Sequence, residues 1–279
     1  MATIAQILAN AAHALRAYTD SPRLDAELLL GKVLGLSRSS LIAHDARLLD
    51  ASDERAYADL LDQRVRGVPI AYLTGAREFW SLPLILTPDV LVPRPETESL
   101  VQLALQVMPQ NAPASVLDLG TGSGAIALSL ASERSCWDIT AVDLSPQALE
   151  VAAQNSTALK LPRIKWRLGN WFDAVPGERF HLIVSNPPYI AEGDRALASL
   201  AAEPVMALTA GPSGLNALRA IIAQAPLHLH PSGWLVLEHG ATQAPAVTDL
   251  LAQHGFTSVS TFSDFSGKPR ITLGTHTQH

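Results

Sequence analysis

The sequence has a single cysteine, Cys136, and no long hydrophobic run. One cysteine excludes an internal disulfide, and such sparing use is typical of proteins in a reducing cytoplasm. No apolar run reaches the ~18–20 residues that a membrane-spanning helix needs. The first residues lack the basic flank and cleavage pattern of a secretory signal. We therefore expect a cytoplasmic protein, and 279 residues suffice for roughly two domains with a buried core.

Positive charge is also scarce. Lys and Arg number 20 against 26 Asp and Glu, which gives a net charge of −6. This balance argues against a nucleic acid held by bulk electrostatics. The nine histidines do not fall in the His, Cys, Asp and Glu spacings that build metal sites, so we expect no metal. The charged helix faces leave no obvious apolar seam, which favours a monomer.

The N-terminal part has helical periodicity and no residues typical of a reaction centre. Apolar residues recur at helical spacing in the stretches 4–15, 24–34 and 57–65. We expect a small helical domain over residues 1–75 that recognises a protein substrate or stabilises the chain. Its charged residues Asp25, Glu27 and Arg64 are expected on a solvated face.

Between residues 76 and 93 the pattern changes to short apolar runs separated by Pro, Ser and Asp, which predicts a β-hairpin linker. The stretch 93–98, Pro-Arg-Pro-Glu-Thr-Glu, then begins a helix. Arg94, Glu96 and Glu98 stand where two domains meet and where clefts tend to form. They belong either to a helix start or to a functional cleft.

From residue 113 strands and helices alternate, which predicts a parallel sheet with helices on both faces, in a domain covering residues 94–279. Strands are expected at 115–119, 138–142, 164–168, 182–185, 234–237, 257–262 and 270–273, and helices at 125–131, 148–158, 215–225 and 244–254.

A glycine-rich loop follows the first of these strands. Residues 118–124 read Asp-Leu-Gly-Thr-Gly-Ser-Gly and open a helix, so backbone can approach a ligand and the helix offers free N–H groups. A dinucleotide fold would require Gly-x-Gly-x-x-Gly, whereas these glycines alternate strictly. Asp143 ends the next strand about 20 residues on, the position of a carboxylate that binds ribose hydroxyls. Ser145 already caps the following helix, which favours the ribose role for Asp143.

Two further strand ends carry notable side chains. Trp171 and Phe172 close the third strand, where they either flank an adenine or join the core. The apolar run 182–184 leads into Ser-Asn-Pro-Pro-Tyr at 185–189. The prolines stiffen this loop, which presents an amide, bare carbonyls and an aromatic face suited to gripping a flat –NH2 group. Taken alone, the same stretch also fits a Pro-rich turn after a core strand.

Together these elements resemble the bacterial PrmC/HemK family, the release factor glutamine methyltransferases. The Asn-Pro-Pro-Tyr signature is similar to that of methyltransferases acting on planar nitrogens. The loop 118–124 resembles motif I of the AdoMet-dependent methyltransferases. The stretch 93–98, the helical N-terminal domain and the late Leu-Glu-His-Gly at 237–240 narrow the resemblance to this family.

The resemblance implies an α/β fold of the class I AdoMet-dependent methyltransferases: a Rossmann-like, mostly parallel seven-stranded sheet, with an N-terminal helical bundle and a hairpin linker. It implies S-adenosyl-L-methionine as cofactor. The implied substrate is the glutamine of the Gly-Gly-Gln motif of class 1 peptide chain release factors, methylated on its side-chain amide nitrogen. The implied cofactor-binding residues are Gly120, Thr121, Gly122, Ser123, Gly124, Asp143, Trp171 and Asn186. The implied substrate-binding residues are Asn186, Pro187, Pro188 and Tyr189, of which Asn186, Pro187 and Tyr189 are catalytic.

This sequence departs from the family pattern in two places. Asn170 stands where many relatives have an acid, and the Ala- and Leu-rich stretch 194–202 looks shorter than in close relatives. The signature places no obvious general base, so positioning and electrostatics are expected to dominate catalysis.

Three other functions remain open. The first is a methyltransferase acting on a glutamine of a ribosomal protein, and the second a nucleic-acid amino-methyltransferase, which the acidic balance disfavours. The third is a non-catalytic AdoMet-binding protein, against which the intact signature argues.

Overall fold

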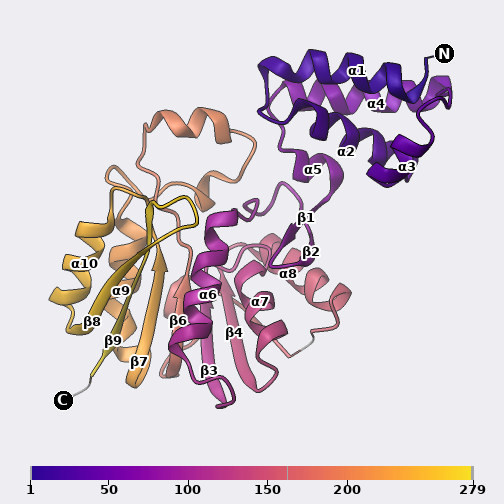
Figure 1. Ribbon diagram of the computed structural model, residues 1–279. Coiled ribbons are helices and arrows are strands. Elements are labelled where there is room, and N and C mark those ends of the chain that lie inside the picture. Colours follow the sequence, from indigo (N-terminus) through magenta and orange to yellow (C-terminus); the bar gives the residue numbers. More distant parts are fainter. Residues whose placement is uncertain (1, 162, 278–279) are drawn as a thin grey trace. The chain divides into compact units, whose positions relative to one another are not determined.

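The computed structural model describes residues 2–161 and 163–277 (Figure 1). The chain divides into two compact units. A helical unit comprises Met1–Ala76 with Ser199–Ala202, and a sheet unit comprises Arg77–Ala198 with Glu203–His279. In the described residues, no helix has both the length and the apolar character needed to cross a membrane.

The helical unit contains α1 (Ile4–Ala14), α2 (Pro22–Leu34), α3 (Arg38–Ala43), α4 (Ala51–Val65) and α5 (Ile70–Thr74). The three predicted helices correspond to α1, α2 and α4. The short helices α3 and α5 were not predicted, since one or two turns show no clear periodicity. Thr3 and Gln6 form a capping box at α1, and Gly35 ends α2 with a φ of 64°.

The prediction of a solvated face for Asp25, Glu27 and Arg64 is wrong. Asp25 and Glu27 are only 3% and 4% exposed. Arg64 Nε lies 2.8 Å from Asp25 Oδ2, and Glu27 accepts from Arg23 and Arg38. The physical reason is that α2 contacts α1, α3, α4 and α5, so few of its positions are left facing water. Its buried carboxylates are therefore paired with arginines.

The sheet unit is built on seven strands in the order β5-β4-β3-β6-β7-β9-β8. Strands β3 to β7 all run parallel to one another, and β9 is antiparallel to both β7 and β8. The strands are β3 (Ala114–Leu119), β4 (Trp137–Asp143), β5 (Lys165–Leu168), β6 (Phe180–Ser185), β7 (Leu229–Glu238), β8 (Phe256–Ser263) and β9 (Pro269–His276). The predicted α/β fold with a mostly parallel sheet is confirmed.

Helices cover both faces of this sheet (Figure 1). They are α6 (Glu98–Val107), α7 (Ala125–Glu133), α8 (Pro146–Ala158), α9 (Asn216–His228) and α10 (Ala244–Gln253). Successive residues of one strand belong to opposite cores: Val116 packs with the α6–α7 side and Leu117 with the α9–α10 side. This double burial explains the nearly continuous apolar runs in the strand sequences.

A two-stranded hairpin, β1 (Ala76–Phe79) and β2 (Leu82–Ile85), precedes the sheet. Its turn residues Trp80 and Ser81 both have positive φ, at 51° and 59°. Asn155 of α8 is fully buried and anchors the hairpin by pairing with both the N–H and the C=O of Ile85. The same amide donates to the Ser123 carbonyl. One side chain thus joins the hairpin, α8 and the glycine-rich loop.

We expect Asn155→Ala to lower the free energy of unfolding by about 3 kcal/mol, because each buried polar group left unpaired costs about 1–3 kcal/mol. Urea denaturation of both variants measures this, with Gln154→Ala on the exposed side of α8 as the matched control. That control should change stability by less than about 0.5 kcal/mol. Equal losses in the two variants would contradict the anchoring role.

Candidate active site

Four parallel strands end together at one edge of the sheet. The register aligns one residue from each of β3, β4, β6 and β7 in a row: Leu119, Val142, Ser185 and Leu237. The next residue along each strand is, in turn, Gly120, Asp143, Asn186 and Glu238. Three of the residues predicted for the site therefore lie side by side because of strand register alone.

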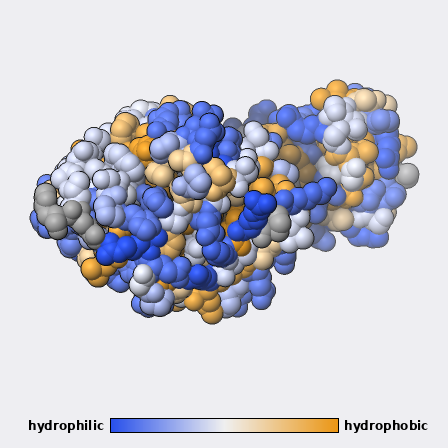
Figure 2. All heavy atoms as spheres, turned by 90° about the horizontal axis from the view of Figure 1, so that it is seen from below, coloured by the Kyte–Doolittle hydropathy of each residue, from blue (hydrophilic) through white to orange (hydrophobic). Residues whose placement is uncertain are grey.

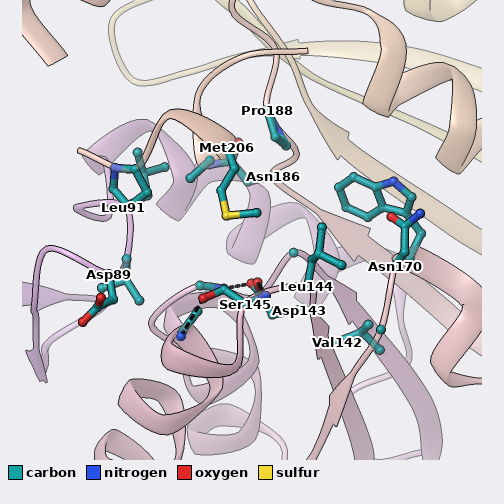
Figure 3. A pocket seen from close by; sticks show the side chains of 18 residues that line it. Asp89, Leu91, Val142, Asp143, Leu144, Ser145, Asn170, Asn186, Pro188 and Met206 are labelled. Atoms are coloured by element: carbon teal, nitrogen blue, oxygen red, sulfur yellow. Dashed lines mark hydrogen bonds between the residues drawn. The ribbon is translucent and has the colours of Figure 1, made fainter. Parts of the chain in front are cut away.

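A pocket opens at this edge of the sheet (Figure 3). Concave sites of this kind are where proteins bind small molecules. The pocket is lined by residues of the strand ends and by two loops; they include Asp89, Leu91, Gly120, Gly122, Asp143, Leu144, Ser145, Asn170, Trp171, Asn186, Pro188, Pro204 and Met206. The cofactor position and the amide-binding position predicted from the sequence thus share one cavity.

Asp143 is held by backbone donors on both carboxylate oxygens. Its Oδ2 accepts from Gly122 N at 2.8 Å, and its Oδ1 accepts from Ser145 N at 2.9 Å. Burial raises the pKa of this carboxyl. Ser145 Oγ accepts from Ala148 N at 3.1 Å, so Ser145 is the cap of α8, as predicted. Each Asp143 oxygen retains a lone pair that a ligand hydroxyl can use.

The glycine-rich loop forms no cradle for a phosphate. The N–H groups of Gly120 and Thr121 both donate to the Val142 carbonyl, and those of Gly122 and Gly124 also have acceptors within the chain. Free N–H groups were expected at the start of the following helix, and there Ala127 N donates to Asp118 Oδ2 at 3.2 Å. Gly120, Gly122 and Gly124 all have positive φ, between 56° and 82°, which favours glycine at each position. A ligand without phosphate suits such a loop.

Three loop residues predicted to bind cofactor are not among those that line the pocket. Thr121 Oγ1 donates to Asp118 Oδ2 at 2.6 Å, and Ser123 is buried. A Cβ on Gly124 would come within 3.0 Å of Leu128. These three residues pack on the side of the loop away from the pocket, whereas Gly120 and Gly122 line the pocket.

Asp118 lies fully buried beneath the loop. Desolvation raises the pKa of its carboxyl to about 7, opposed by donation from Thr121 and Ala127. Its Oδ1 has no hydrogen-bond partner among the residues the structure describes. The sequence showed this acid as part of the loop pattern but not as a separate site residue.

The two aromatic residues after β5 have different surroundings. Trp171 lines the pocket, and its ring would come within 3.3 Å of a Cβ on Gly120. Its φ of 48° lies in the left-handed region, which costs roughly 1–2 kcal/mol for an L-residue. Phe172 is buried in the core and its ring stacks on that of His228, with 4.5 Å between the ring centroids. Of the two alternatives for Phe172, the structure therefore shows the core position, whereas Trp171 and Asn170 line the pocket.

Asn186 has one end of its amide fixed. Its Nδ2 donates to Thr97 Oγ1 at 3.1 Å, and no described residue donates to its Oδ1. Thr97 belongs to the stretch 93–98 and is only 3% exposed. The prediction that this stretch reaches a cleft was made for Arg94, Glu96 and Glu98, whereas Thr97 is the residue that holds the signature.

The other three signature residues, Pro187, Pro188 and Tyr189, lie in different surroundings. Pro188 lines the pocket and Pro187 is buried beside it. Tyr189 is not among the pocket-lining residues. Its hydroxyl donates to Glu238 Oε1 at 3.2 Å, and its carbonyl accepts from Gln243 Nε2 at 3.0 Å. Tyr189 is thus fixed at both its side chain and its backbone.

Two walls of the pocket were not predicted. One is the loop 89–91, and the other contains Pro204 and Met206, whose side chain extends toward Ser145 (Figure 3). Glu203, the residue before Pro204, connects the two walls. Its carboxylate accepts from Arg94 at 2.6 Å and from Val92 N, just after the loop 89–91, at 3.1 Å. Neither loop has a hydrophobic periodicity that would have revealed it.

Comparison with known proteins agrees with this architecture. Family models described as PrmC N-terminal domain and Methyltransferase small domain match residues 6–75 and 98–212. A release factor glutamine methyltransferase of Xylella fastidiosa is 48% identical over 254 residues, 90% of this chain and 92% of the relative. A release factor glutamine methyltransferase of Coxiella burnetii is 42% identical over 271 residues, which cover 97% of this chain and 98% of the relative. The chain belongs to the release factor glutamine methyltransferase family.

A solved methyltransferase from Pyrococcus furiosus has a TM-score of 0.54 at 19% identity, covering 71% of this chain and 90% of that one. This likeness concerns the fold. It agrees with the mostly parallel sheet of this chain.

Membership of the methyltransferase family implies AdoMet as methyl donor. The residues present fit this molecule. Asp143 offers two acceptor oxygens to a ribose, the loop lacks the free N–H cradle that a phosphate requires, and Leu144 and Trp171 give the pocket apolar walls. Asn186 lies in the same pocket.

We expect Asp143→Ala to weaken AdoMet binding by about 1–3 kcal/mol, the range for hydrogen bonds to a charged group. Isothermal calorimetry measures the change in Kd. Asp143→Asn is the matched control, because it keeps one acceptor oxygen and should lose less affinity than the alanine variant. An unchanged Kd for Asp143→Ala would refute the ribose assignment.

Proposed function

We propose that the protein transfers a methyl group from AdoMet to the side-chain amide nitrogen of the glutamine in the Gly-Gly-Gln motif of class 1 release factors. The observation that carries the proposal is that Asn186 and Asp143 line one pocket. The family relationship supports release factor as the substrate. We propose that this reaction takes place in the cytoplasm, which agrees with a release factor as the substrate.

The amide clamp consists of Asn186, Pro187, Pro188 and Tyr189 in this proposal. Because Asn186 Nδ2 is committed to Thr97, its Oδ1 is available to accept one hydrogen of the substrate –NH2 group. The Pro187 carbonyl accepts the other. Two acceptors fix the plane of the amide and increase the electron density on its nitrogen.

The chain supplies orientation and electrostatics. A bound AdoMet contributes an activated methyl group on a positively charged sulfur. Asp143, Gly120, Gly122 and Trp171 hold it at the ends of β3, β4 and β5, while Asn186 holds the amide at the end of β6. The carboxylates among the described pocket-lining residues are Asp143, which accepts two backbone N–H groups, and Asp89, which accepts from Thr87. Neither is assigned to the amide in this proposal, so positioning carries the catalysis.

The helical unit, residues 1–75 in the sequence-based division, is proposed to recognise the protein substrate. Its match to the PrmC N-terminal domain model supports this role. We also propose that the protein is a monomer that does not stably bind nucleic acid. On the face shown in Figure 2, hydrophobic residues are interspersed among hydrophilic ones, and the net charge is −6.

The decisive test is transfer of labelled methyl from AdoMet to purified release factor, beside a variant in which the glutamine of Gly-Gly-Gln is alanine. Label on the first and none on the second is expected. Label on neither would refute the proposal. Parallel reactions with ribosomal proteins and with RNA and DNA would then identify the alternative substrate.

Asn186→Ala should abolish turnover while AdoMet binding stays within about tenfold, because the side chain acts on the substrate amide more than on the donor. Single-turnover methyl transfer and calorimetry measure the two effects separately. Asp138→Asn, which changes an exposed carboxylate on β4, is the control and should keep full turnover. Retained turnover in Asn186→Ala would remove this residue from the catalytic role.

A further inference from the structure

Glu238 is a buried acid at the candidate site for which the clamp described above gives no role. It is the last residue of β7 and follows Leu237, which pairs with Ser185 just before Asn186. Its side chain is 0% exposed, and its Oε2 has no hydrogen-bond partner in the described part of the chain. Burying a carboxyl without full compensation is costly, so its presence here calls for a role.

We call Tyr189 and Asn186 the two arms of the clamp. Glu238 contacts the first of them, Tyr189, directly. Its Oε1 accepts from the Tyr189 hydroxyl at 3.2 Å. Burial, the charge of Glu238 and this hydrogen bond all raise the pKa of Tyr189, so the phenol remains a donor. The orientation of the Tyr189 ring is therefore tied to the carboxylate.

Glu238 reaches the other arm through Thr97. Thr97 is buried next to the clamp, and a hydrogen bond from its hydroxyl to Glu238 would lower the pKa of that carboxyl. The same hydroxyl oxygen accepts from Asn186 Nδ2 at 3.1 Å. Because Thr97 has one hydrogen, it can donate to Glu238 while accepting from Asn186.

The direction of this chain of hydrogen bonds depends on the state of Glu238. An ionised carboxylate only accepts, so Tyr189 donates to it and the Thr97 hydroxyl can turn its hydrogen toward it as well. The Thr97 oxygen is then left to Asn186 Nδ2, which turns Asn186 Oδ1 toward the pocket. A protonated Glu238 can instead donate to Thr97, whose own hydrogen then turns away from Glu238. Asn186 Oδ1 can accept that hydrogen once the amide rotates, which turns the oxygen away from the pocket.

We propose that Glu238 is a positioning residue whose carboxylate holds both arms of the amide clamp and turns the Asn186 oxygen toward the substrate. This inference rests on the proposed function, because the clamp is assigned to the glutamine amide. Glu238 acts through Thr97 and Tyr189 and is not itself a catalytic residue.

The charges around Glu238 determine how it titrates. Burial is the largest influence and raises the pKa of Glu238 to about 7, and Glu96 of the 3-10 helix Pro95–Thr97 acts in the same direction. Arg270 of β9 lowers it, although Arg270 is also paired with Asp264 at 3.4 Å. The adjacent His239 points to Thr272, and burial lowers the pKa of its ring, which keeps it neutral near pH 7.

Ionised Glu238 is the competent form, so kcat should rise with pH through about 7 and level off above it. The raised pKa of Glu238 has the opposite effect on the stability of the fold. Folding favours the protonated carboxyl, so the stability that this form contributes is lost as pH rises from the pKa of Glu238 in the unfolded chain toward about 7. An increase of kcat with pH therefore cannot result from a gain in stability at this residue.

The test compares wild type with Glu238→Gln, which has nearly the same shape but carries no charge. We expect kcat for release factor to fall on the order of a hundredfold, the scale of a misplaced reacting group. The rise of kcat near pH 7 should disappear, while KM for release factor and Kd for AdoMet stay within about threefold. Glu238→Asp should recover part of kcat and part of the pH dependence.

Thr97→Val tests the relay without altering the carboxylate. It should lower kcat, and the double variant Thr97→Val/Glu238→Gln should lose less than the product of the two single losses, because both changes break one chain. Asp138→Asn, on the exposed surface of β4, controls for loss of a carboxylate and should keep the wild-type pH profile.

The outcomes separate the two proposals. No methyl transfer by wild type to release factor would overturn the proposed function and this inference with it. Transfer by wild type combined with an unchanged kcat and pH profile in Glu238→Gln would overturn the inference alone. Fully multiplicative losses in the double variant would also overturn it, since Thr97 and Glu238 would then act independently.

Discussion

Parallel strand register is the constraint on which the site depends. A parallel sheet brings the carboxyl ends of its strands to one edge, and the register of β3, β4, β6 and β7 places Gly120, Asp143, Asn186 and Glu238 in neighbouring positions. Side chains alternate between the two faces of a strand, so a slip of one residue would exchange the two cores. The apolar clusters on both faces therefore fix the site as well as the fold.

The sequence predicted those features that recur with a period or end a strand. The alternation of strands and helices, the glycine loop, Asp143 and Asn186 were all visible because each stands at a fixed point of a local pattern. Where local patterns gave two readings, packing decided between them. Phe172 joined the core although its neighbour Trp171 lines the pocket.

The features that were missed depend on contacts between residues far apart in the chain. Thr97 and Asn186 are 89 residues apart, and Asn155 and Ile85 are 70 apart. No spacing rule relates such pairs. The buried acids of α2 were misassigned for a related reason: a charged residue in a helical pattern normally faces water, and only the surrounding helices show that α2 does not.

The wall formed by Met206 has a chemical consequence. The side chain lines the pocket and is 55% exposed, so its thioether is open to small oxidants. Oxidation to the sulfoxide would replace a flexible apolar group with a polar one in the wall of the pocket. Cys136, the single thiol, precedes β4 at the end opposite Asp143. The redox vulnerability of this pocket therefore lies at a methionine, and its reversal would require a sulfoxide reductase rather than a thiol exchange.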